Sequence, residues 1–298
     1  MDIKHCMICP RNCGINRSDG EKGYCKAGEL PKCALASVHH WEEPPISGTK
    51  GSGTVFFSYC NLNCVFCQNY TISAQGFGKE LTIEQLADVF LSQQKKEVHN
   101  INLVSPTHFI PQIKEALSLA KQKGLHIPIV YNTNSYEKVE SLALLEGLID
   151  VYLPDFKYIS SAYSKTYSFA HDYAKYATKA ILEMKRQQPE MVFDSNGILQ
   201  KGVIIRHLVL PGCYKDSFAI LDWIKQELGE DTYVSVLNQY TPMYRASEYK
   251  QIARKTMTLE YQKVVEHFFA IGLKNGFMQK RNSATSEYTP MFNLSGLP

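Results

Sequence analysis

The sequence has few of the features that mark membrane, secreted or nucleic-acid-binding proteins. No apolar run in its 298 residues reaches the length of a membrane span, and the N-terminus lacks the basic and then apolar layout of a signal peptide. Basic and acidic residues nearly balance, 32 against 29, and no dense basic tract is present. We therefore expect a cytoplasmic protein that binds neither membrane nor nucleic acid.

Cysteine is almost absent from the last three quarters of the chain. Eight of the nine cysteines lie before residue 68, and most of them are spaced as ligands. Disulfides are typical of small secreted chains, whereas a chain in the reducing cytosol uses such clusters to bind metal. The cysteine distribution therefore indicates metal binding.

Three of these cysteines, Cys60, Cys64 and Cys67, form a C-x3-C-x2-C run after the strand-like segment 53–59. A cubane iron–sulfur cluster is normally held by four thiolates, so a local trio leaves one iron open to bind and activate another ligand. An open iron indicates an enzyme rather than an electron carrier. The alternative is a zinc knuckle that a histidine elsewhere in the chain completes.

With Phe66 before the third cysteine, the run resembles the signature of the radical S-adenosylmethionine (SAM) family, C-x3-C-x-φ-C with φ aromatic. The resemblance implies a 4Fe-4S cluster whose open iron chelates the amino and carboxylate groups of SAM. It implies reductive cleavage of SAM to methionine and a 5′-deoxyadenosyl radical, which abstracts hydrogen from a substrate. It also implies an electron donor such as flavodoxin or ferredoxin.

From residue 53 onward, β-branched or aromatic runs alternate with amphipathic stretches, which predicts six βα units around a parallel sheet. We expect strands at 53–59, 101–105, 127–131, 149–153, 203–209 and 233–237. We expect helices at 83–97, 110–123, 136–146, 173–187, 215–228 and 259–273. Because a closed barrel needs eight units, the predicted fold class is α/β, an open partial (β/α)6 barrel, as the radical SAM resemblance also implies. We divide the chain into a Cys-rich extension, 1–50, and a barrel domain, 51–298.

Parallel βα folds place their chemistry in the loops at the carboxyl ends of the strands. Many radical SAM proteins carry Gly-Gly-Glu-Pro after the second strand, but 104–108 keeps only the proline, so Ser105 and Thr107 would supply the polar contacts to SAM. Thr107 as a helix cap is the alternative. After the third strand, Asn132 and Asn134 are further candidates for SAM binding, with a hydrogen-bonded turn as the alternative.

Asp155 and Lys157 follow the fourth strand and stand two residues apart, so in an extended segment they point the same way and can hold one zwitterionic ligand. The pair resembles the Asp-x-Lys element of glycyl-radical enzyme activases, where it helps to hold SAM; a surface ion pair is the alternative. On the fifth strand, His207 is similar to the histidine that precedes a Pro-Gly turn in the activases. It is either a SAM contact or a buried histidine with satisfied hydrogen bonds.

The widest resemblance is to the uncharacterised branch of pyruvate formate-lyase activating enzyme homologues. Six motifs of that branch occur here in order, at 9–14, 42–48, 51–57, 67–70, 104–108 and 239–242. The resemblance implies an oxidoreductase that abstracts hydrogen from a protein or peptide, with a glycyl-radical enzyme as a candidate partner. The alternatives are a radical SAM enzyme for a small metabolite and a non-catalytic iron–sulfur or zinc scaffold that senses redox state.

A second metal site is expected in the N-terminal extension, which is too short to bury a core and therefore needs a staple. Zinc would satisfy four thiolates, and a second 4Fe-4S cluster would serve as an electron relay or a substrate anchor. The spacing C-x2-C-x3-C-x11-C is not that of bacterial ferredoxins and favours a structural metal. Cys33 is a substitute ligand, and Cys213 is an ordinary buried residue. The segment 39–43 is expected to be a polar linker, with a metal site at its two histidines and two glutamates as the alternative. The four expected ligands are Cys6, Cys9, Cys13 and Cys25.

Overall fold

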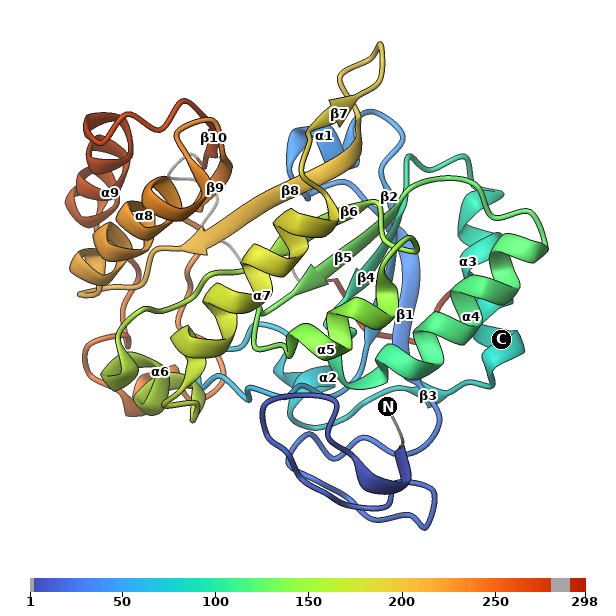
Figure 1. Cartoon of the computed structure of the whole chain (residues 1–298). Helices are drawn as coiled ribbons and strands as arrows, with labels where there is room; N and C mark the ends of the chain where they lie inside the picture. The colour runs from blue at the N-terminus through green and yellow to red at the C-terminus, as the bar shows by residue number, and fades with distance from the viewer. Residues whose placement is uncertain (1–2, 280–289) are drawn as a thin grey trace.

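The computed structural model describes residues 3–279 and 290–298, which form a mixed sheet flanked by helices (Figure 1). The parallel strands are β2 (Ser52–Phe57), β4 (Ile101–Val104), β5 (Ile129–Thr133), β6 (Val151–Pro154), β8 (Leu199–Leu208), β9 (Tyr233–Leu237) and β10 (Asn275–Met278). The antiparallel strands are β1 (Lys32–His39), β3 (Lys79–Glu80) and β7 (Val192–Phe193). The order is β10-β9-β8-β6-β5-β4-β2-β1-β3, and β7 pairs with β8.

The longer helices follow the strands as βα units require. They are α3 (Ile83–Gln94), α4 (Ile110–Gln122), α6 (Ser161–Ser168), α7 (Tyr173–Gln187), α8 (Tyr214–Leu228) and α9 (Thr258–Ala270). Short helical turns are α1 (Pro44–Ser47), α2 (Tyr70–Ser73), α5 (Val139–Leu142), η1 (Ile3–His5), η2 (Thr107–Phe109), η3 (Ala143–Leu145) and η4 (Ala246–Glu248). Thr82 starts α3 with a reciprocal capping box to Gln85, as its sequence favours.

The predicted α/β fold with six βα units is confirmed, and the helix expected over 136–146 is the least accurate element. The structure has only α5 and η3 there. Tyr136 and Glu137 do not enter a helix because the Asn134 side chain accepts from the Tyr136 N–H, while Glu137 is buried against Thr107 and Thr133. These hydrogen bonds fix a turn in place of the first helical turn.

The strands β1 and β10 extend the sheet beyond the six expected units. Strand β1 pairs with β2, although it lies within the range 1–50 that we assign to the extension; the division at residue 50 stays a prediction. The last residues of the chain cover the outer edge of β1. Leu294 donates to the Ala34 carbonyl at 3.0 Å, and the Ala36 N–H donates to Ser295 at 2.9 Å. Gly296 is needed there because a Cβ would lie 2.0 Å from the Ala36 carbonyl.

Alternate residues of each inner strand face either the helices or the inside of the partial barrel. On β8, Ile205 belongs to the large core that also includes Ile220 and Ile224 of α8. Arg206 and Leu208 instead line an internal cavity. This alternation follows from the period of two along a strand. Apolar packing therefore fixes the helices outside, and polar side chains collect inside.

Candidate active site

A cavity of about 640 Å³ opens at the carboxyl ends of the parallel strands and continues into the barrel. Most of the residues expected to bind the cluster and SAM line it. They are Cys60, Phe66, Cys64, Cys67, Ser105, Asn132, Asn134, Asp155 and Lys157. Side chains at the carboxyl ends of four strands, β2, β4, β5 and β6, therefore meet in one space, as the rule for parallel sheets predicts.

The loop that carries the cysteine trio is held in a strained backbone path. Tyr59 and Asn63 have φ angles of 74° and 64°, in the left-handed region that residues with a Cβ rarely adopt. Such strain persists only where the surroundings fix the backbone, and it concentrates at functional sites. The loop therefore places the three thiols at the cost of local conformational energy.

Each sulfur of the trio has a polar neighbour. Asn134 donates to the Cys60 Sγ at 3.4 Å, and Ser168 donates to the Cys64 Sγ at 2.9 Å. The Cys67 Sγ lies 3.2 Å from the Ser73 Oγ. Hydrogen bonds to thiolates orient metal ligands and tune the reduction potential of a cluster.

Without a metal, the buried thiols of Cys64 and Cys67 keep their protons. Burial raises the pKa of Cys64 to about 12, and the charges of Cys60 and Cys67 raise it further, against the influence of Lys157. Burial also raises the pKa of Cys67. A bound cation reverses this balance, because coordination deprotonates a thiol outright.

Asp155 and Lys157 form a buried ion pair that Arg206 extends. The Lys157 Nζ lies 2.8 Å from Asp155, and the guanidinium of Arg206 lies 2.8 Å from the other oxygen of the same carboxylate. These side chains are only 13–22% exposed, so the surface ion pair considered for Asp155 and Lys157 is wrong. Burial opposes ionisation of Asp155, but the two cations outweigh it and hold its pKa below the ordinary value.

Arg206 also contacts Glu42 at 3.0 Å and the Asn132 amide oxygen at 2.6 Å. Burial raises the pKa of Glu42 and of Glu43, although Arg206 acts against it in both cases. The polar linker expected over 39–43 is therefore wrong at these two residues, which line the cavity. Nothing in the alternation of the sequence marks Glu42 or Glu43 as internal, because they follow β1 outside a regular element.

Thr107 and His207 do not line the cavity. The Thr107 hydroxyl donates to Glu137 at 2.7 Å and is buried. His207 has Phe156 and Ser217 as partners, each at 2.8 Å, and burial lowers its pKa to about 4. Both side chains therefore lie outside the cavity in this structure, and their expected contact with SAM stays a prediction. Strand parity explains the position of His207, because Arg206 takes the inward position and His207 contacts Ser217 of α8.

Comparisons with known proteins identify the family. Residues 54–199 match the Radical SAM superfamily. The uncharacterised protein MJ0674 of Methanocaldococcus jannaschii is 32% identical over 276 residues, which cover 89% of this chain and 74% of MJ0674. The chain belongs to the radical SAM superfamily.

Solved structures agree with this radical SAM fold. Streptococcus suis SuiB bound to S-adenosylmethionine superposes with a TM-score of 0.52 and 15% identity, over 74% of this chain and 48% of SuiB. SuiB bound to the precursor peptide SuiA superposes with a TM-score of 0.51 and 15% identity, over 74% of this chain and 47% of SuiB. At this identity the likeness shows the fold, and the radical SAM chain spans about half the length of SuiB.

No helix among the described residues is both long and apolar enough to cross a membrane.

Membership of the superfamily indicates an enzyme and implies a 4Fe-4S cluster and SAM. The trio fits the cluster because its three sulfurs share one cavity with polar neighbours. Across 3–279 and 290–298, no three His, Cys, Asp or Glu side chains are placed to hold a single metal ion. A cubane takes one thiolate per iron, so its ligands surround a volume instead of a point.

Proposed function

We propose that this radical SAM chain is an oxidoreductase that abstracts hydrogen from a protein or peptide, with a glycyl-radical enzyme as the partner class. The observation that carries the proposal is that the cysteine trio and a buried network of charges line one cavity. Cys60, Cys64 and Cys67 would hold the 4Fe-4S cluster. An electron donor such as flavodoxin or ferredoxin would reduce that cluster, and transfer of the electron to SAM would give methionine and a 5′-deoxyadenosyl radical.

The polar wall beside the trio suits the charged and hydroxylated groups of SAM. The Asp155 carboxylate can accept from an ammonium or a ribose hydroxyl, and Lys157 can donate to a carboxylate. Ser105, Asn132 and Asn134 add uncharged donors and acceptors, and Phe66 adds an apolar surface. The narrower placement in the branch of pyruvate formate-lyase activating enzyme homologues rests on the sequence motifs.

Two features support a macromolecular substrate. A volume of about 640 Å³ is typical for one ligand of drug size, so SAM leaves room for only a side chain or a loop of a second molecule. Trp41 lines the cavity and is 63% exposed, and exposed aromatic residues are enriched at protein interfaces. SuiB, which shares the fold, has been seen with a precursor peptide.

The experiment that tests the chemistry is anaerobic reconstitution with iron and sulfide, followed by SAM and a strong reductant. We expect 5′-deoxyadenosine and methionine as products. Cys64→Ala should lose both the cluster and the products, whereas the matched control Cys213→Ala, whose thiol does not line the cavity, should keep them. An unchanged yield from Cys64→Ala would contradict the assignment, and a wild-type protein that binds a cluster but never cleaves SAM would favour a scaffold.

The substrate class is tested by isotope transfer. Cells that contain the protein are grown on deuterated amino acids, and their extract is split into macromolecular and small-molecule fractions. We expect deuterium to enter 5′-deoxyadenosine only with the macromolecular fraction. Transfer from the small-molecule fraction alone would replace a protein or peptide with a small metabolite as the substrate.

A further inference from the structure

The N-terminal segment brings four cysteines around a second, much smaller cavity. Its volume is about 10 Å³, and residues from two parts of the segment, 6–17 and 23–27, line it. All nine cysteines of the chain are free of disulfides. A space of this size holds about one water molecule or one ion, and a cubane cluster is much larger. The four cysteines on its wall are Cys6, Cys9, Cys13 and Cys25.

Backbone N–H groups are directed at these sulfurs. The Cys9 sulfur accepts from the N–H of Arg11 and the Cys25 sulfur from the N–H of Ala27, in both cases two residues further along the chain. The Cys13 Sγ accepts from the N–H of Tyr24 at 3.3 Å. Charge-assisted donation to a thiolate is stronger than donation to a neutral thiol, so these loops suit deprotonated sulfur.

Glycine keeps space for one of these sulfurs. A Cβ on Gly23 would lie only 2.8 Å from the Cys13 Sγ. Any other residue at this position would displace the sulfur or the loop that follows it. Glycine at position 23 therefore allows the backbone to approach the Cys13 sulfur this closely.

A buried cation lies beside the four thiols and forms no ion pair with a carboxylate of residues 3–279 or 290–298. Arg17 is 2% exposed; its guanidinium donates to the carbonyls of Gly28 and His108, at 2.7 and 2.6 Å, and lies 5.4 Å from the centre of the Phe109 ring. Its Nη2 has no hydrogen-bond partner among the described residues, and the side chain lines the small cavity. A buried charge that only neutral groups surround destabilises the folded state, because these groups do not replace the lost hydration in full. Four thiolates around a divalent ion carry two net negative charges and would neutralise Arg17.

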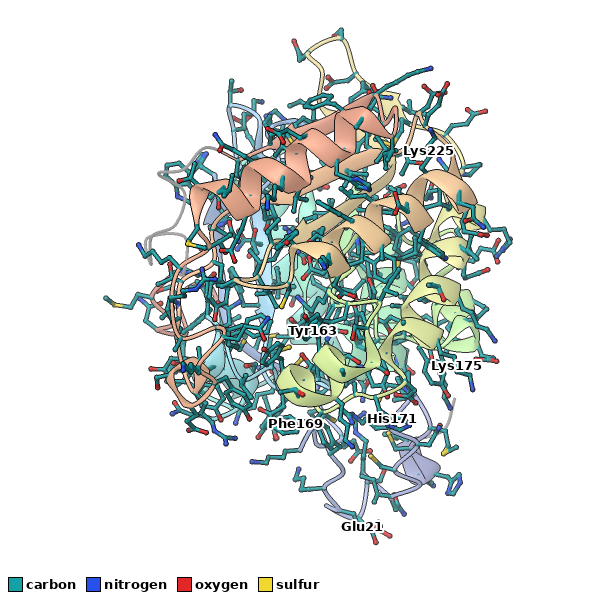
Figure 2. The ribbon with its side chains drawn as sticks, turned by 90° about the vertical axis from the view of Figure 1, so that its left-hand side faces the viewer. Glu21, Tyr163, Phe169, His171, Lys175 and Lys225 are labelled. Atoms are coloured by element: carbon teal, nitrogen blue, oxygen red, sulfur yellow. The ribbon has the colours of Figure 1, made fainter. Side chains whose placement is uncertain are left out.

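The same segment forms hydrogen bonds with the loop that carries the cysteine trio. Arg11 donates to the carbonyl of Asn61 at 2.8 Å and to that of Phe169 at 2.6 Å. Tyr24 donates to the carbonyl of Leu62 at 3.0 Å and stacks on the Arg11 guanidinium. Figure 2 shows Phe169 directly above the segment that carries Glu21. In the sequence, Arg11 lies two residues from both Cys9 and Cys13, and Tyr24 lies next to Cys25.

We propose that Cys6, Cys9, Cys13 and Cys25 bind one tetrahedral metal ion, zinc or iron, with Arg17 as its buried counter-charge, and that this ion fixes Arg11 and Tyr24 against the loop of the main cluster. In the described part of the chain, no three of these thiols are close enough together to coordinate one ion. Binding therefore requires the four side chains to rotate towards the centre of the small cavity. The ion makes the N-terminal segment a support for the catalytic loop.

The site is tested in the full chain with Cys60, Cys64 and Cys67 all changed to Ala, which removes the main cluster ligands. We expect one zinc or iron per chain and no acid-labile sulfide. Cobalt(II) should replace the ion and give the intense visible absorption of a tetrahedral thiolate site. Adding Cys13→Ser should remove the metal, and adding the matched control Cys33→Ala should not. A metal-free protein, a metal that survives Cys13→Ser, or iron accompanied by sulfide would overturn the proposal.

Single substitutions in the otherwise unchanged protein test the role of Arg17 as counter-charge and the support of the main-cluster loop by the N-terminal ion. Arg17→Gln should weaken binding of the N-terminal ion at least tenfold in competition with a chelator, and Arg17→Lys should recover part of that loss. Cys13→Ser and Arg11→Gln should each speed the loss of main-cluster iron to a chelator by about fivefold or more, because the loop opens more readily. Arg186→Gln, at an exposed ion pair, is the control. Equal rates in all variants would overturn the support role. These readouts measure metal, so they are independent of whether SAM is cleaved.

Discussion

Arg206 connects three walls of the large cavity. Its guanidinium holds Asp155 after β6, Glu42 after β1 and Asn132 at the end of β5. The Arg206 side chain is 13% exposed, and those of Glu42 and Asp155 are 10% and 22% exposed. Loss of the arginine would therefore leave two carboxylates in a poorly hydrated space.

Arg206→Met should lower the free energy of unfolding by about 3–5 kcal/mol, the usual cost of removing one partner of a buried pair. Combining it with Glu42→Gln should recover part of the loss, because one stranded charge is removed. Denaturant unfolding of the metal-free proteins gives the comparison. A loss below about 1 kcal/mol for the single variant would mean that solvent already screens the network.

Asp155→Asn and Lys157→Met should each raise the Kd for SAM roughly tenfold to hundredfold while the cluster remains, since one charged contact contributes about 1.5–3 kcal/mol. Thr107→Val and His207→Gln are the controls. They should lower the free energy of unfolding but leave the Kd for SAM unchanged, because neither side chain reaches the cavity. Titration of SAM into the reconstituted proteins would show whether the two groups separate.

Glu260 predicts a pH dependence of stability. Hydrogen bonds from Arg254 lower its pKa to about 2, burial acts in the opposite direction, and the N–H groups of Met257 and Gly212 lower it further. A folded-state pKa below the ordinary 4.5 contributes stability above pH 4.5, and that contribution is lost as the pH falls towards 2.

We therefore expect Glu260→Gln to lower the free energy of unfolding by about 1–3 kcal/mol at pH 7. This difference from wild type should shrink as the pH falls from 4.5 to 2. Unfolding curves across that range are the measurement. Glu248→Gln removes an exposed ion pair with Arg245 and should leave the free energy of unfolding nearly unchanged. A Glu260→Gln difference that is the same at pH 7 and pH 3 would show that the effect is not electrostatic.

At the scale of elements, the sequence predicts which segments are strands more reliably than it predicts which side faces inward. The β-branched runs mark all six expected strands, because buried parallel strands need apolar residues on both faces. For the same reason β8 shows no alternation: Ile204 and Ile205 are both fully buried. The inward position of Arg206 over His207 therefore follows only from the register of the sheet.

The candidate site was predictable where its residues lie in the loops after strands. The trio, Asp155 and Lys157 belong to this group. Glu42 reaches the cavity from the segment after β1, and β1 itself reads Lys-Cys-Ala-Leu-Ala-Ser-Val-His, with few of the residues that favour strands. Contacts across such distances in sequence depend on the packing of the whole sheet.

The cysteine loop offers a test of its backbone strain. Asn63→Val should lower the stability of the folded loop by about 1–2 kcal/mol, since a β-branched residue is disfavoured at a φ of 64°. Asn63→Gly should be tolerated. Limited proteolysis within the loop and the yield of reconstituted cluster are the measurements, and a valine variant that matches the glycine variant in both would show that the loop relaxes.

At the scale of the whole molecule, the tail from Pro290 to Pro298 protects the sheet. An open strand edge is a template for pairing with other chains, and residues 294–296 occupy that edge on β1. Phe292 packs edge-on against Phe56 of β2 with ring centroids 5.4 Å apart. Deletion of residues 290–298 should therefore convert a part of the protein to dimers and larger species. Light scattering after gel filtration is the measurement, and a deletion that elutes like the full chain would contradict it.

The position of this tail also sets an order of events during synthesis. Strand β1 leaves the ribosome early, but the residues that cover its edge are about 255 positions later and emerge long after it. At synthesis rates of about 5–20 residues per second, the edge stays open for a time on the order of tens of seconds in each nascent chain. Neighbouring ribosomes on one message hold several such edges close together. The yield of folded protein should therefore depend on how fast translation proceeds from β1 to residues 290–298 and on the chaperones that bind β1 first.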